Sequence, residues 1–103
     1  MRFHCKITIP AGPGNAAIID GTIASKFQRV LGDLKPEAVY FGLMDGQRTV
    51  YLVVDVASAD RMVPTFEPFW LDWNADVEIS PVMTRADLEK GIKDFERVLA
   101  GRK

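Results

Sequence analysis

The dipeptide Asp45-Gly46 stands between two segments in which every second residue is apolar. A two-residue type I′ turn requires positive φ at both central positions, and Asp-Gly is one of the pairs that tolerate it best. The pattern therefore predicts a β-hairpin with strands over 37–43 and 47–56. The turn also fixes the register, which pairs apolar residues with one another and sets Tyr40 opposite Tyr51.

The same two-residue alternation predicts a strand over 2–9 and another over 76–82. Apolar residues at helical spacing predict a helix over 16–32, after a break at 10–14. A second helical pattern covers 59–72, where two prolines predict a kink or two separate pieces. Together with a third helix near the C-terminus, three helices and four strands are expected.

The last of these helices is expected to begin after Thr84. This residue is a good N-cap, and Asp87 stands three positions later, as in a capping box. Four apolar residues at helical spacing predict a stripe buried against the rest of the domain: Leu88, Ile92, Phe95 and Leu99.

The order of elements, β-α-β-β-α-β-α, indicates a single α+β domain over 1–103. With right-handed crossovers, the simplest arrangement is a ferredoxin-like βαββαβ antiparallel sheet of order 4-1-3-2 with an added C-terminal helix. The helices are expected to cover the sheet face that carries Ile7, Phe41, Leu52, Val54 and Ile79.

The opposite face of the sheet mixes aromatic, polar and charged residues: His4, Lys6, Thr8, Tyr40, Tyr51, Val53, Asp55, Glu78 and Ser80. Strand adjacency predicts that His4 lies near Asp55 and that Lys6 approaches Glu78. His4 is the one side chain with an ordinary pKa near neutrality, so it is a candidate general base that Asp55 would orient. The alternative is a histidine held in a dimer interface or a structural network.

The composition of the chain argues against several classes of binding partner and cofactor. The net charge is −1, and no basic stripe with interleaved aromatics exists, so binding to nucleic acid is not expected. One His and one Cys argue against a structural zinc site, and no dinucleotide motif is present, so no cofactor is expected. The absence of a signal peptide or an apolar span predicts a cytoplasmic protein without membrane contact. Cys5 is expected to be buried and unreactive.

Two stretches, 34–38 (LKPEA) and 76–84 (DVEISPVMT), resemble a group of bacterial proteins in the dimeric α+β-barrel superfamily. That superfamily includes muconolactone-isomerase-like and cofactor-independent monooxygenase-like members. The resemblance implies that two sheets pack face to face as a homodimer and that a small, fairly apolar ligand is bound. It supplies no reaction, because one fold hosts several chemistries.

Two functional hypotheses follow. The first is a homodimeric barrel that binds a small organic or aromatic ligand, with isomerase-like or monooxygenase-like chemistry as one possibility. In it, His4 and Asp55 are the candidate catalytic pair, and the candidate ligand-binding residues are Tyr40, Tyr51, Trp70 and Glu78. The second is a non-catalytic interaction module whose polar sheet face serves dimerisation alone.

Overall fold

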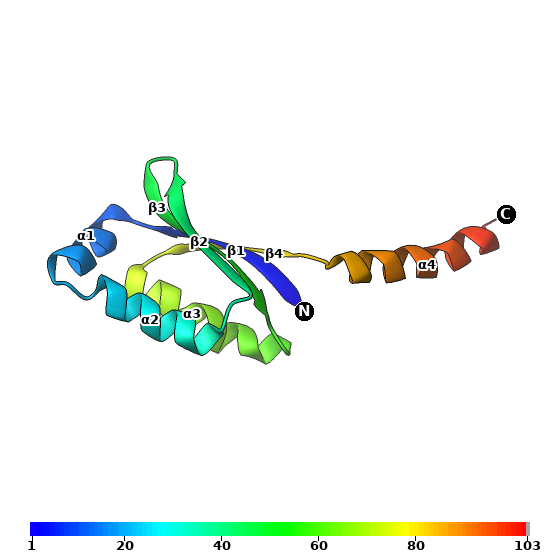
Figure 1. Ribbon diagram of the computed structural model, residues 1–103, viewed down its shortest axis with the longest axis horizontal. Coiled ribbons are helices and arrows are strands. Elements are labelled where there is room, and N and C mark those ends of the chain that lie inside the picture. Colours follow the sequence, from blue (N-terminus) through cyan, green and yellow to red (C-terminus); the bar gives the residue numbers. More distant parts are fainter. Residues whose placement is uncertain (103) are drawn as a thin grey trace.

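The computed structural model describes residues 1–102 as a four-stranded antiparallel sheet, two helices packed on one face of it, and two helices at its ends (Figure 1). The elements are β1 (Arg2–Ile9), α1 (Ala11–Ile19), α2 (Ile23–Leu34), β2 (Ala38–Met44), β3 (Gln47–Asp55), a 3₁₀ turn (Ala59–Arg61), α3 (Met62–Trp73), β4 (Asp76–Pro81) and α4 (Arg85–Gly101). The protein is therefore an α+β chain, as predicted.

The sheet has the order β2-β3-β1-β4, which is 4-1-3-2 when read from the other edge. This arrangement is compatible with the expected ferredoxin-like fold. Each strand lies within one residue of its predicted bounds. Asp45 and Gly46 have φ of 53° and 74°, the conformation that a type I′ turn requires. The hairpin register pairs Tyr40 with Tyr51, as predicted.

The core lies between the sheet and the helices α2 and α3. Alternate residues of β1 and β3 point into it, and Phe66, Phe69 and Trp73 of α3 meet them. Trp73 is fully buried, and its ring stacks on Phe27 of α2 at a centroid distance of 4.8 Å. Ile7, Leu52 and Val54 are buried as predicted, but Phe41 and Ile79 are 58% and 36% exposed because β2 and β4 are edge strands that the helices only partly cover.

The single helix predicted over 16–32 is wrong, since the structure has two helices there and the first begins at Ala11. Pro13 fits the first turn of α1 because the first four N–H groups of a helix have no partner within it. Gly21 adopts φ of 77°, and the Asp20 carboxylate accepts hydrogen bonds from the backbone and hydroxyl of Thr22. This turn competes with helical geometry and divides the segment.

The helix predicted over 59–72 is in two pieces, as expected: a 3₁₀ turn and then α3. Pro64 stands in the first turn of α3, where it removes no helical hydrogen bond, and Pro68 lies inside the helix. None of the helices within residues 1–102 is both long enough and apolar enough to cross a bilayer.

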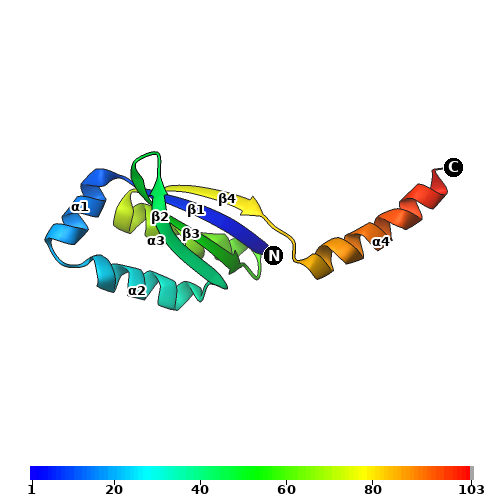
Figure 2. The same cartoon turned by 45° about the horizontal axis from the view of Figure 1, so that its top comes forward.

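The helix α4 begins as predicted but does not pack as predicted. Thr84 and Asp87 form a full capping box, with bonds of 3.1 Å and 3.0 Å. The helix then runs away from the sheet beyond the end of β4, and none of its residues is buried (Figure 2). The predicted burial of its stripe is therefore wrong: these four side chains are 46–51% exposed. Two features keep the stripe of α4 exposed. The helices α2 and α3 already cover the face on which it was expected to pack, and the chain leaves the end of β4 in a direction away from the sheet.

The capping box makes the start of α4 sensitive to acid. Hydrogen bonds from the backbone and side chain of Thr84 hold the pKa of Asp87 below its usual value. A carboxylate with a lowered pKa stabilises the folded form above its ordinary pKa of about 3.9, and this stabilisation is lost as the pH falls through the lower folded value. We expect Asp87→Ala to reduce circular dichroism at 222 nm at pH 7 and to match the wild type near pH 2. A difference that persists unchanged at pH 2 would contradict this assignment.

Candidate functional site

Among residues 1–102 no helix covers the face of the sheet opposite α2 and α3, which is called here the open face. The strand registers arrange its residues in three rows, each of which crosses all four strands. In the order β2, β3, β1, β4 the rows are Ala38–Val53–His4–Ser80, Tyr40–Tyr51–Lys6–Glu78 and Gly42–Thr49–Thr8–Asp76. The β2–β3 half is mainly apolar or aromatic and the β1–β4 half is polar and charged.

The middle row brings together three of the four predicted ligand-binding residues. Tyr40 and Tyr51 are direct partners, and Lys6 lies between Tyr51 and Glu78. The Lys6 ammonium is 3.7 Å from the Glu78 carboxylate, which confirms the predicted approach of these two side chains. The Lys6 side chain is only 26% exposed, whereas Tyr40 is 71% exposed. The row therefore offers an aromatic surface beside a partly buried cation.

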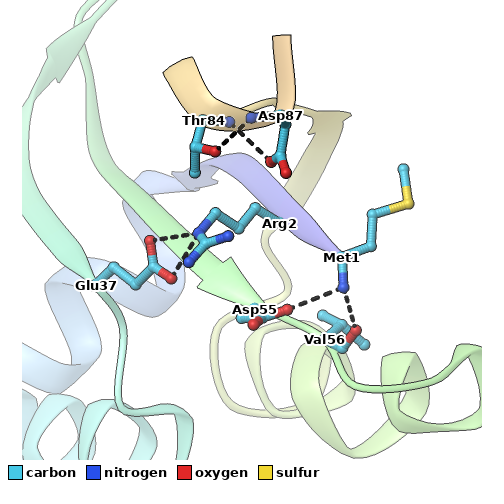
Figure 3. A network of polar contacts seen from close by, with 7 residues as sticks. All are labelled: Met1, Arg2, Glu37, Asp55, Val56, Thr84 and Asp87. Atoms are coloured by element: carbon cyan, nitrogen blue, oxygen red, sulfur yellow. Dashed lines mark hydrogen bonds and ion pairs between the residues drawn. The ribbon is translucent and has the colours of Figure 1, made fainter. Parts of the chain in front are cut away.

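His4 lies on the open face, partly buried, with its ring 6.3 Å from that of Tyr51 and tilted by 33°. Asp55 is on the same face but one row further along, opposite Arg2. Its carboxylate accepts a hydrogen bond of 2.9 Å from the amino group of Met1, and this bond lowers its pKa (Figure 3). Within the described residues no hydrogen bond joins His4 to Asp55, so an orienting role for Asp55 stays a prediction.

Arg2 and Glu37 extend the polar end of the open face and were not predicted. The Arg2 Nε donates to both oxygens of Glu37, at 2.8 Å and 3.0 Å (Figure 3). The strand alternation carried a signal for Arg2, which stands two residues before His4 and so shares its face. For Glu37 the alternation pointed to the other face, because the predicted strand began at 37 and gave this residue the parity of Phe41. In the structure β2 begins at Ala38, and Glu37 reaches Arg2 across β3.

A hollow of about 570 Å³ lies at this end of the sheet, where the chain passes from β4 into α4. Its lining comes from three segments distant in sequence: Met1, Arg2, Asp55, Pro81, Val82, Met83 and Asp87. Arg2 and Asp55 thus border both the open face and the root of α4, and Figure 3 shows the first turn of α4 beside Arg2. The hollow is therefore lined by one guanidinium (Arg2), two carboxylates (Asp55 and Asp87) and several apolar side chains.

The fourth predicted ligand-binding residue, Trp70, is not part of this arrangement. It lies on α3, in the helix layer, and the sheet separates it from the tyrosines.

Cys5 is fully buried on the helix-covered face, and burial raises the pKa of its thiol to about 11. A thiol that stays protonated at neutral pH is a poor nucleophile, in agreement with the prediction.

Among residues 1–102, no group of three or more His, Cys, Asp or Glu side chains is arranged to hold a metal ion. No model of a protein family matches the chain, and no curated protein matches it significantly. The chain belongs to the α+β class, with one face of its sheet left uncovered by the helices of residues 1–102.

Proposed function

We propose that this protein is a homodimer in which two open faces oppose each other and enclose a small organic ligand. The observation that supports this most directly is the one-sided sheet: helices cover one face, and partly buried His4, Lys6, Tyr51 and Val53 form the centre of the other. Sheets that pack face to face lie about 10 Å apart, and the small side chains of the rows that flank the middle row, among them Ala38, Gly42 and Ser80, leave room for a flat molecule beside it.

The chemistry of the middle row suggests the ligand class. Tyrosine faces favour aromatic rings, and the Lys6 ammonium favours a carboxylate, so an aromatic or other apolar carboxylate fits the row best. If the ligand is also converted, His4 is the candidate that exchanges a proton with it, since its ring lies beside Tyr51. Isomerase-like or cofactor-free monooxygenase-like chemistry is what the resemblance to the dimeric α+β-barrel superfamily implies, and we propose it on that ground alone.

Thermal unfolding in the presence of benzoate and hydroxybenzoates tests this proposal. A ligand at ten times its dissociation constant adds about 1.4 kcal/mol, which raises the Tm of a domain of this size by roughly 6–11 °C. We expect Tyr51→Ala to abolish the shift and Leu71→Ala, on the outer side of α3, to retain it. Light scattering must also give twice the monomer mass. An unchanged ligand shift in Tyr51→Ala would refute the site.

The second candidate function is an interaction module without a ligand. Ion pairs within the chain favour it, because Arg2, Lys6 and Asp55 already have partners in Glu37, Glu78 and the Met1 amino group. His4→Ala separates the two candidates. A variant that loses the dimer, while no carboxylate stabilises the wild type, supports the module; a variant that stays dimeric but loses ligand stabilisation supports the binding site.

A further inference from the structure

The helix α4 gives the molecule a shape that a single compact domain does not have. A domain of about 100 residues has a radius of gyration near 13 Å, whereas this chain has 17.7 Å and extends over 64 × 28 × 18 Å. The excess comes from α4, which leaves the sheet as a free arm (Figures 1 and 2). In proteins most of the stability of a helix comes from packing of its amphipathic face, which α4 lacks among residues 1–102, and Gly91 in its interior weakens it further.

The apolar stripe of α4 has the spacing of a coiled-coil seam. Leu88, Ile92, Phe95 and Leu99 follow one another at intervals of four, three and four residues, the d-a-d-a positions of a heptad repeat. Met83 continues the stripe at the root, so an apolar surface runs along the arm. A narrow seam of this kind packs against one other helix rather than against the broad surface of a sheet.

The arm points away from its own sheet for a reason that lies in the connection. The Val82 N–H donates to the Arg2 carbonyl at 3.1 Å, so the chain continues along β1 past the end of β4. The Thr84 capping box then starts the helix two residues later. No other helix within residues 1–102 lies along the stripe, which therefore lacks a partner inside the chain.

We infer that two copies of this chain pair their α4 arms along the seam, in parallel. The inference rests on the proposed homodimer and adds a second contact to it. A two-fold axis that runs parallel to the strands, between the two open faces, sends both arms out at the same end of the dimer. The arms extend beyond the end of the sheet, where they are free to converge to the 8–10 Å between the axes of packed helices.

The charges beside the seam select the parallel direction. Glu89 and Glu96 occupy the e positions, while Gly91 and Val98 occupy the g positions. An antiparallel pair would bring Glu89 of each arm against Glu96 of the other, so two pairs of like charges would repel along one side of the contact. A parallel pair sets each Glu96 beside Gly91 of the partner and creates no such repulsion.

Single cysteines on α4 test this inference, because the native Cys5 is buried and its raised pKa keeps it unreactive. In a parallel pair each seam residue meets its own copy, so Ile92→Cys and Leu99→Cys should each form a disulfide-linked dimer under mild oxidation. Lys90→Cys, on the outer face of the same helix, is the matched control and should cross-link at least tenfold more slowly. Circular dichroism confirms that each variant is folded.

The outcomes separate this inference from the proposed function. If Ile92→Cys cross-links no faster than Lys90→Cys while light scattering still gives a dimer, the arm pairing is wrong and the homodimer stands. If Leu99→Cys cross-links only with Leu88→Cys, the arms are antiparallel and the inference fails. If both seam variants cross-link but no carboxylate raises the Tm, the arm pairing holds and the proposed ligand site fails.

Discussion

Trp73→Ala is expected to lower the free energy of unfolding by about 3–5 kcal/mol, a large part of the 5–15 kcal/mol typical of a domain. The side chain is fully buried at the end of α3 and stacks on Phe27, while the Lys26 ammonium lies 5.5 Å from the centre of its ring. Its removal leaves a cavity between α2, α3 and the sheet. Urea denaturation followed by circular dichroism measures the effect.

Trp73→Phe is the matched control for this prediction. The indole Nε1 of Trp73 is buried and has no hydrogen-bond partner among the described residues, so phenylalanine removes a polar atom that burial disfavours. We expect this variant to lose less than half as much stability as Trp73→Ala. A smaller loss in Trp73→Ala than in Trp73→Phe would mean that the packing described between α2 and α3 is incorrect.

Phe95→Asp is expected to raise the dissociation constant of the homodimer at least 100-fold, if the arms pair as inferred. Phe95 lies in the middle of the seam, and burial of a large apolar side chain contributes about 1.5–3 kcal/mol. The substitution acts twice in a symmetric dimer, and it also places two carboxylates against each other. Analytical ultracentrifugation over a range of concentrations measures the constant.

Ala86→Asp controls for the added charge in this experiment. Ala86 is exposed on the opposite side of α4, so the variant carries the same extra negative charge but leaves the seam intact. We expect its dissociation constant to stay within a few-fold of the wild type. Equal weakening by both variants would show that charge alone, and not the seam, controls association.

Much of the fold could be predicted from local pattern. The hairpin at Asp45-Gly46 is an example, because positive φ and two-residue alternation are properties of adjacent residues. The break at Gly21 was missed because Ile19, Ile23 and Phe27 keep helical spacing on both sides of it. The turn that interrupts the helix is a short-range polar contact between Asp20 and Thr22, which the apolar spacing does not reveal.

The candidate site was predicted in part. Alternation assigned His4, Lys6, Tyr40, Tyr51 and Glu78 to one face of the sheet, and the registers agree. Trp70 was grouped with them on composition alone, and helical spacing does not show on which layer an aromatic residue lies. Asp55 is on the expected face, but Met1 binds it, a contact between residues 54 positions apart.

The sequence by itself therefore determined the strands, the hairpin register and the start of α4, since each depends on neighbouring residues and on hydrogen bonds that they form with one another. Only the tertiary structure decided what α4 does. The stripe from Leu88 to Leu99 has the same spacing whether it meets its own sheet or a second molecule. The choice depended on the direction in which the chain leaves β4 and on the space that α2 and α3 had already filled, and neither is a property of the stripe.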